Sequence, residues 1–246
     1  MFFPIKDYNP TRKVAYVTIA IIVLNVLVFI YQNYIASAGL NHFVSYYSLV
    51  PHEITHSENV KIFVERDMFG NPVLLNRTIS PILSIVSSMF MHGSIMHLLG
   101  NMLFLWIFGN NIEDYLGKIL FVFFYFAVGT GAALFHIVFN WNSLVPVIGA
   151  SGAVSGVMGA YLILYNKAKI KTLVFIFIFI TFIDIPAGVL LVLWFIFQFF
   201  YSSGGGIAWL AHVGGFILGV ILIIIAKKKI PVIEVLTEKD IFTEGE

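Results

Sequence analysis

Two polar residues interrupt apolar segments of the sequence and could act together in chemistry. Ser151 has Gly149 two residues before it and Gly152 directly after it, and His212 lies near the start of another apolar run. A neutral imidazole that accepts the proton of a serine hydroxyl turns that hydroxyl into a nucleophile. Taken alone, a serine among glycines is typical of close helix packing in membranes, and a lone histidine can be a buried side chain bonded to a backbone carbonyl. The chemical interpretation therefore requires that the fold bring the two residues together.

A second pair of polar residues could serve the same reaction. His97 and Asn101 are four residues apart, so their side chains share one face of a helix. Both can donate hydrogen bonds to the oxyanion that forms when a serine attacks a carbonyl group, and the backbone at Gly149 and Ser151 could add further donors.

The amino-acid composition indicates the class of protein that must position these residues. Hydrophobic residues make up 59% of the 246 residues and charged residues only 11%, which is typical of a chain embedded in a lipid bilayer. The net charge of +1 and the lack of a basic stripe exclude nucleic acid as a partner. The absence of cysteine excludes thiolate catalysis, disulfides and cysteine-bound metals.

The apolar runs predict an all-α polytopic membrane protein, a six-transmembrane-helix bundle with a long first extracytoplasmic loop. The predicted spans are 14–35, 94–112, 119–138, 147–164, 187–201 and 207–226. The mixed loop at 36–88 is expected to lie against the bilayer surface. The apolar run 172–183 is too short to cross, so we interpret it as an interfacial or re-entrant lead-in to the fifth span. The predicted domains are a cytoplasmic N-terminal segment 1–13, a six-helix domain 14–229 and a polar C-terminal tail 230–246.

Basic residues predict the orientation in the membrane. With six spans, every Lys and Arg except Lys61, Arg66 and Arg77 falls on the same side as both termini. The positive-inside rule makes that side the cytoplasm, and we expect a multi-pass protein of the cell membrane.

This topology predicts that the polar residues form one layer. The second, fourth and sixth spans all enter from the outer side, which places His97, Ser151 and His212 roughly 5–10 Å below it. Ser151 shares a small-residue stripe with Gly152 and Gly156, and His212 shares one with Gly215. If the stripes meet, the imidazole reaches the hydroxyl. No Asp or Glu lies in the outer half of a predicted span, so the serine and histidine would act without a carboxylate that orients the ring.

Two other functions fit parts of this pattern. His92, His97 and His212 could form a three-histidine zinc site with an open position, but no carboxylate is available to orient the ligands. We therefore predict no metal and no cofactor. A small transporter could use the histidines as a proton relay, but the sequence has neither outer intramembrane carboxylates nor an evident inverted repeat.

At these residues the chain resembles the rhomboid family of intramembrane serine proteases. The motifs are Gly149-Ala150-Ser151-Gly152, His92 with His97-Leu98-Leu99-Gly100-Asn101, Phe108-Gly109-Asn110-Asn111-Ile112-Glu113-Asp114 and Ala211-His212-Val213-Gly214-Gly215-Phe216. The resemblance implies a six-helix core, transmembrane proteins as substrates, Ser151 as the nucleophile and His212 as the general base. It also implies an oxyanion hole at His97, Asn101 and the Ser151 backbone, and a packing role for Glu113. His92, Gly152, Gly156 and Gly215 are expected to support the structure.

The sequence departs from this family in two places. Ser155 stands where some members have a tyrosine that stacks on the histidine, so Trp209 or a phenylalanine would have to steady the His212 ring. The loop 36–88 lacks the Trp-Arg pair of many members. A non-catalytic rhomboid-like scaffold that binds membrane helices is the alternative function, although it would need none of the four polar residues. Trp194 and Phe197 are expected to border the lateral route of a substrate helix.

Overall fold

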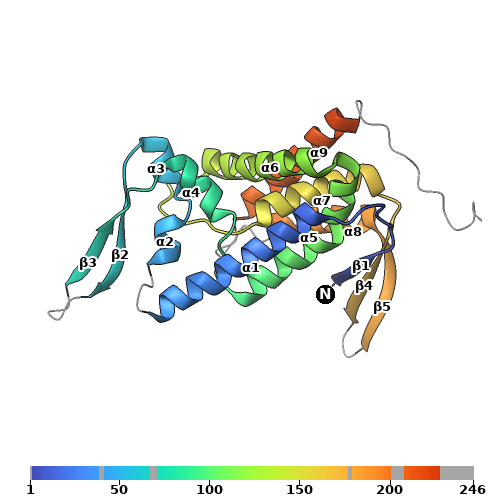
Figure 1. Cartoon of the computed structure of the whole chain (residues 1–246), viewed down its shortest axis with the longest axis horizontal. Helices are drawn as coiled ribbons and strands as arrows, with labels where there is room; N and C mark the ends of the chain where they lie inside the picture. The colour runs from blue at the N-terminus through green and yellow to red at the C-terminus, as the bar shows by residue number, and fades with distance from the viewer. Residues whose placement is uncertain (1, 39–41, 67–70, 177–178, 201–207, 228–246) are drawn as a thin grey trace, which may run out of the picture.

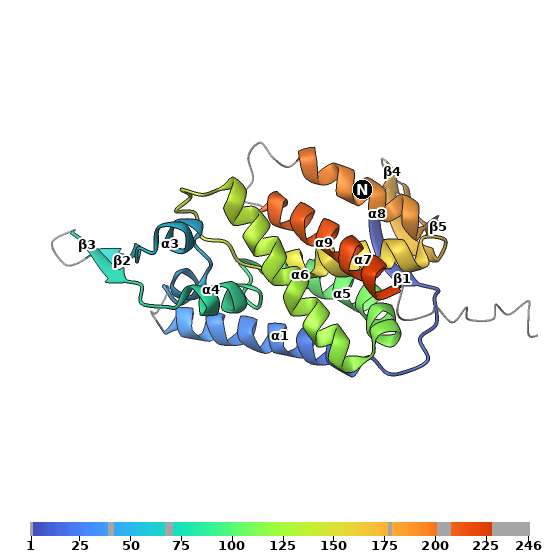
Figure 2. The same ribbon diagram turned by 90° about the horizontal axis from the view of Figure 1, so that it is seen from above.

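The computed structural model describes residues 2–38, 42–66, 71–176, 179–200 and 208–227 (Figure 1). The described part of the chain is mostly helical, with a bundle of six main helices and two small sheets. Both views place these sheets at opposite ends of the bundle (Figures 1 and 2). The predicted tail 230–246 and the predicted turn at 202–206 lie outside the described residues.

Six apolar helices correspond to the six predicted spans. They are α1 (Tyr16–Ser37), α5 (Ile95–Leu116), α6 (Lys118–Phe139), α7 (Ser151–Tyr165), α8 (Ala187–Gln198) and α9 (Trp209–Lys227). Among the described residues, four of them, α1, α5, α6 and α9, are long and apolar enough to cross a membrane. The apolar helices α7 and α8 have only 15 and 12 residues. The chain is thus a multi-pass membrane protein, with four candidate spans by length and composition.

Two local signals set the ends of α5. The Ser94 hydroxyl accepts a hydrogen bond from the backbone N–H of His97 at 3.2 Å, which caps the start of the helix. Gly117 ends the helix with a φ of +78°, a conformation that favours glycine. Because α6 begins at the next residue, the two helices are joined by this single glycine.

The fourth predicted span begins later than expected. We predicted a helix from residue 147, but α7 begins at Ser151. Val147 forms a β-bridge with Leu49, and Gly149 has a φ of +127°, so neither residue can belong to a helix. Ser151 is therefore the first residue of α7 and does not lie one turn into the helix, as a start at residue 147 would require.

Glycines bring α7 and α9 together backbone to backbone. A Cβ atom added to Gly215 would overlap the carbonyl group of Gly152, and one added to Gly219 would overlap that of Gly156. The small-residue stripes of the two helices thus face each other. On another side of α7, Gly156 packs against Val128 of α6. This close packing sets α7 in the middle of the bundle, in contact with α5, α6, α8 and α9.

The all-α prediction is wrong at the run 172–183. This run forms most of an antiparallel hairpin of β4 (Lys169–Ile176) and β5 (Phe179–Pro186), which β1 (Phe2–Asp7) extends into a sheet of order β1-β4-β5. The run is rich in β-branched and aromatic residues, which favour strands, and its apolar character alone could not distinguish a strand from a helix. β5 leads directly into α8.

The segment between α1 and α5 is more ordered than the predicted loop. It holds α2 (Phe43–Tyr47), α3 (Pro51–His56), the hairpin of β2 (Lys61–Arg66) and β3 (Pro72–Asn76), and α4 (Pro81–Ser88). The fully buried Arg77 ties it together, since its guanidinium forms a 2.8 Å ion pair with Glu53 and donates to the carbonyl groups of Tyr46 and Ser48. A buried arginine thus anchors the segment that lacks a Trp-Arg pair.

Candidate active site

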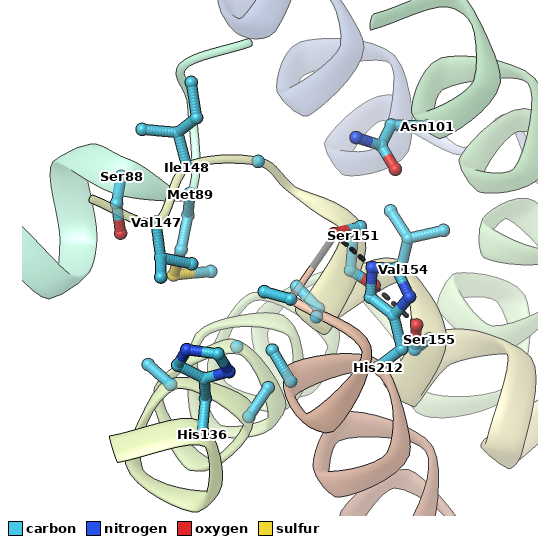
Figure 3. A pocket seen from close by; sticks show the side chains of 18 of the residues that line it. Ser88, Met89, Asn101, His136, Val147, Ile148, Ser151, Val154, Ser155 and His212 are labelled. Atoms are coloured by element: carbon cyan, nitrogen blue, oxygen red, sulfur yellow. Dashed lines mark hydrogen bonds between the residues drawn. The ribbon is translucent and has the colours of Figure 1, made fainter. Parts of the chain in front are cut away.

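The fold brings Ser151 and His212 into direct contact. Ser151 is the first residue of α7, and His212 lies in the first turn of α9. Their side chains point toward each other (Figure 3), and the distance between Ser151 Oγ and His212 Nε2 is 2.8 Å. The close approach of Gly152 and Gly215 next to this pair explains why the hydroxyl and the ring meet. A serine whose hydroxyl donates to an imidazole has the geometry of a base-activated nucleophile.

The other ring nitrogen of His212 has a partner that the sequence did not suggest. Its Nδ1 lies 2.8 Å from Oε1 of Gln198, the last residue of α8. Nε2 of Gln198 donates at 3.0 Å to the carbonyl group of Trp194. The sequence predicted that no carboxylate would orient the imidazole, because no Asp or Glu lies in the outer half of a predicted span. An amide occupies that position instead.

An aromatic ring of α8 also lies beside the histidine. The Trp194 and His212 rings have centroids 6.0 Å apart and planes tilted by 35°. Trp209, which we considered for this role, packs instead against Phe199. Ser155 does not replace the missing aromatic ring, since its hydroxyl donates at 2.6 Å to the backbone carbonyl of Ser151 (Figure 3).

Gly149 creates the space in which His97 approaches the serine. The backbone of Gly149 has a φ of +127°, and an added Cβ atom would lie 2.8 Å from Cε1 of His97. Any side chain at this position would therefore displace the imidazole of His97 as well as strain the backbone. The absence of a side chain at Gly149 keeps the His97 ring next to the start of α7.

The backbone donors next to the serine differ in availability. The N–H of Gly149 donates at 2.8 Å to the carbonyl group of Ser88, so it is occupied and does not fit the predicted donor role. The amides at the start of a helix lack partners within the helix, and the first bond back along α7 runs from Val154 N–H to the Ala150 carbonyl at 2.9 Å. The Ser151 N–H, at the first position of α7, therefore has no acceptor within the helix.

The side chain of Asn101 forms a hydrogen bond with another histidine, His92. Its Nδ2 lies 2.9 Å from Nε2 of the fully buried His92, and the backbone of His92 is in turn bonded to the Gln32 side chain on α1. An amide nitrogen carries two hydrogens, so the bond to His92 leaves one for another acceptor. His92 thus positions Asn101, while the His92 and His97 rings contact each other edge to face at 5.1 Å between centroids.

A cavity of about 870 Å³ connects these groups. Its lining includes Ser151, His212, His97, Asn101 and Gly149. His136 of α6 also lines it, on the far side of the view in Figure 3 from Asn101. Among the described residues, no group of three His, Cys, Asp or Glu side chains has the arrangement of a metal site. The arrangement fits attack by a serine on a carbonyl group better than metal chemistry.

A comparison with protein families places this site in a known context. The model of the Rhomboid domain matches residues 80–229, which is more than half of the chain. The chain belongs to the rhomboid family. The match extends from α4 to the end of α9 and includes Ser151, His212, His97 and Asn101.

Two curated proteins are similar to this rhomboid. "Rhomboid protein 1, mitochondrial" of Saccharomyces cerevisiae is 32% identical over 151 residues, 56% of this chain and 40% of the relative. "RHOMBOID-like protein 6, mitochondrial" of Arabidopsis thaliana is 35% identical over 112 residues, 43% of this chain and 36% of the relative. The chain spans less than half the length of either protein.

Glu113 lies away from the cavity of this rhomboid and connects two helices. Its carboxylate accepts hydrogen bonds from the backbone N–H groups of Val17 and Thr18, at 2.9 and 2.7 Å, and from the Thr18 hydroxyl at 2.8 Å. These N–H groups belong to the first turn of α1, where a helix lacks internal partners and favours negative charge. Glu113 therefore fastens the start of α1 to α5, at a distance from the chemistry.

Proposed function

We propose that this rhomboid is an intramembrane serine endopeptidase that hydrolyses peptide bonds in or near the transmembrane segments of other proteins. The observation that carries the proposal is the 2.8 Å contact between Ser151 Oγ and His212 Nε2 at the wall of a cavity in a membrane bundle. A non-catalytic scaffold would require neither this contact nor the polar groups around it. The reaction needs no metal or cofactor.

The proposed reaction proceeds through an acyl-enzyme. Ser151 Oγ attacks the carbonyl carbon of the scissile bond while His212 Nε2 takes the hydroxyl proton. The imidazolium then gives this proton to the departing amine as the tetrahedral intermediate collapses. A water molecule repeats the attack on the ester, with His212 again as the base, and releases the acid product and free Ser151.

The proposed oxyanion hole consists of three donors from two helices. They are the backbone N–H of Ser151 and the side chains of His97 and Asn101, all at the cavity. Fixed donors in a site with little water stabilise the developing negative charge far more than donors in bulk water. In this scheme Gly149 supplies space for His97 rather than a donor.

The position of the cavity supports an outward-facing site. Ser151 and His212 lie at helix starts, near the segment that contains Leu49, which pairs with Val147. The sheet formed by β1, β4 and β5 lies at the opposite end of the bundle (Figure 1). We infer that residues 14–229 form the protease domain, that both termini are cytoplasmic and that the site opens on the extracytoplasmic side of the cell membrane. Proteins with transmembrane segments would then enter from the bilayer.

The test is a fluorophosphonate probe, which reacts with activated serines. We expect the detergent-purified protein to be labelled, and the Ser151→Ala and His212→Ala variants to remain unlabelled while keeping the elution volume of a folded protein. Labelling that persists in Ser151→Ala would place the nucleophile elsewhere. A folded wild type that is not labelled, and that cuts no transmembrane substrate, would favour the scaffold.

A further inference from the structure

We infer that Gln198 is a positioning residue that holds the His212 ring in the tautomer and orientation that the reaction needs. The inference rests on the proposed function and extends it to a residue outside the motifs of the site. Three observations carry it: the hydrogen bonds of the amide group, its burial, and its place on α8.

The hydrogen bonds of Gln198 determine where the proton of the imidazole lies. The Trp194 carbonyl can only accept, so the nitrogen of the Gln198 amide must face it, which directs Oε1 toward His212. An amide oxygen can only accept as well, so Nδ1 of His212 carries the hydrogen. Nε2 is then left with a lone pair directed at the Ser151 hydroxyl, 2.8 Å away. The Trp194 carbonyl group thus sets the orientation of the Gln198 amide. The amide in turn sets the tautomer of His212, so that Nε2 is the nitrogen that accepts the proton of Ser151.

The burial of the Gln198 side chain favours these two hydrogen bonds. Gln198 is only 4% exposed, and it is the one residue with an amide, hydroxyl or charged side chain in α8, whose sequence is otherwise apolar. A buried amide group that loses its hydrogen-bond partners destabilises the folded protein. Both polar atoms of Gln198 are bonded, so loss of the His212 contact would leave the amide oxygen unpaired unless another donor replaced it.

The place of Gln198 links the histidine to the position of α8. Trp194 and Gln198 are one helical turn apart and both contact His212, so α8 presents an aromatic ring and an acceptor to the same imidazole. The ring is therefore oriented only while α8 packs against α9. A displacement of α8 would remove the acceptor from Nδ1 and disturb the Ser151 contact at the same time.

The experiment compares Gln198→Leu with Gln198→Glu. Leucine has a similar volume but accepts no hydrogen bond, whereas the glutamate side chain still presents an oxygen to Nδ1. Asn25→Leu is the matched control, since Asn25 is a buried amide on α1 that also bonds to the carbonyl four residues earlier and does not contact His212. Each variant is purified in detergent, its folding is checked by thermal unfolding, and its rate of fluorophosphonate labelling is measured.

A spectroscopic measurement separates positioning from folding. In protein with ¹⁵N-labelled histidine, the signals absent from His212→Ala report the tautomer of this ring. We expect wild type and Gln198→Glu to have a protonated Nδ1 and an unprotonated Nε2, and Gln198→Leu to have a mixture of tautomers. The labelling rate should fall about 10- to 100-fold in Gln198→Leu, part of the roughly 100- to 10,000-fold that general acid–base catalysis contributes, and remain near wild type in Gln198→Glu and Asn25→Leu.

Two results would overturn the inference. One is a wild-type tautomer in folded Gln198→Leu, and the other is a labelling rate in Gln198→Leu equal to that of Asn25→Leu. The tautomer can be measured even in a protein that is never labelled. If the proposed function is wrong, the wild-type protein will not be labelled, but its His212 ring will still carry the hydrogen on Nδ1. If this inference is wrong, the wild-type protein will be labelled, but the tautomer of His212 will be the same in Gln198→Leu as in wild type.

Discussion

The Cα atom of Gly215 on α9 lies against the carbonyl group of Gly152 on α7, with no room for a side chain between them. This contact directly adjoins Ser151 and lies one helical turn from His212. The distance between Ser151 and His212 therefore depends on two residues that have no side chains.

Gly215→Ala should separate the two helices. The added methyl group would overlap backbone rather than a flexible side chain, so we expect a loss of about 1–3 kcal/mol in stability and a large loss of fluorophosphonate labelling in the protein that remains folded. Gly100→Ala on α5 is the control, because an added Cβ atom meets nothing within 4 Å there. Normal labelling of Gly215→Ala would show that the serine and histidine tolerate the separation.

Removal of the Glu113 carboxylate should affect stability more than chemistry. In Glu113→Ala two backbone N–H groups and one hydroxyl at the start of α1 lose their acceptor, and we expect a loss of about 1–3 kcal/mol. The labelling rate per folded molecule should change little. Thermal unfolding in detergent measures the first effect, with the exposed Glu58→Ala as the control. Equal unfolding temperatures in the two variants would contradict the role of Glu113.

The stability of the protein should depend on pH through Asp7 of β1. Burial raises the pKa of Asp7, an effect that outweighs the hydrogen bonds from Tyr161 and Asn111 to its carboxylate. The folded chain therefore binds the proton more tightly than the unfolded chain. The stabilisation is complete below the ordinary aspartate pKa of about 4, and it is lost as the pH rises through the raised value.

Asp7→Asn mimics the protonated carboxyl group at every pH. We expect the unfolding temperature of this variant to exceed that of wild type by an amount that grows as the pH rises from 4 toward neutrality. Asp184→Asn, at an exposed position on β5, is the control for the loss of a carboxylate from this sheet. If the difference in unfolding temperature between Asp7→Asn and wild type decreased with rising pH, it would contradict a raised pKa of Asp7 in the folded chain.

A substitution of Phe197 can test the predicted lateral route of a substrate helix. Its ring on α8 is 50% exposed, so it borders the lipid rather than the core. We expect Phe197→Ala to change the rate at which a transmembrane substrate is cut while leaving the labelling by a small fluorophosphonate near wild type. Phe123→Ala on α6, where the ring is 68% exposed, is the control for general effects on lipid contacts. An unchanged cutting rate in Phe197→Ala would count against this route.

The sequence predicted the centres of the helices better than the segments that connect them. Hydrophobic length located six apolar helices, and the spacing of Gly152, Gly156 and Gly215 indicated which faces would meet. The start of α7 was placed too early because the apolar run continues through Gly149, whose φ of +127° cannot be read from hydropathy. The hairpin of β4 and β5 was missed for a similar reason, since its residues are as apolar as those of a helix.

Gln198 was missed because its partner is not local. The amide and His212 belong to different helices, and no spacing rule for a single helix relates them. A search for buried amides in apolar helices, in addition to carboxylates, would have identified it as a candidate. Arg77 presents the same difficulty, since its contacts with Glu53, Tyr46 and Ser48 depend on the folding of a whole segment.

The sheet beneath α8 also imposes an order on biosynthesis. Phe2 of β1 pairs with Val174 of β4. β1 is synthesised first, but it can pair only after the ribosome has synthesised α7 and then β4. Pairings this distant in sequence close late. α8 follows β5 without a linker, so its start is tied to this sheet. A nascent chain that has already inserted α1, α5, α6 and α7 would therefore still lack both Gln198 of α8 and His212 of α9, so the contact between Ser151 and His212 can form only after nearly the whole chain has been made.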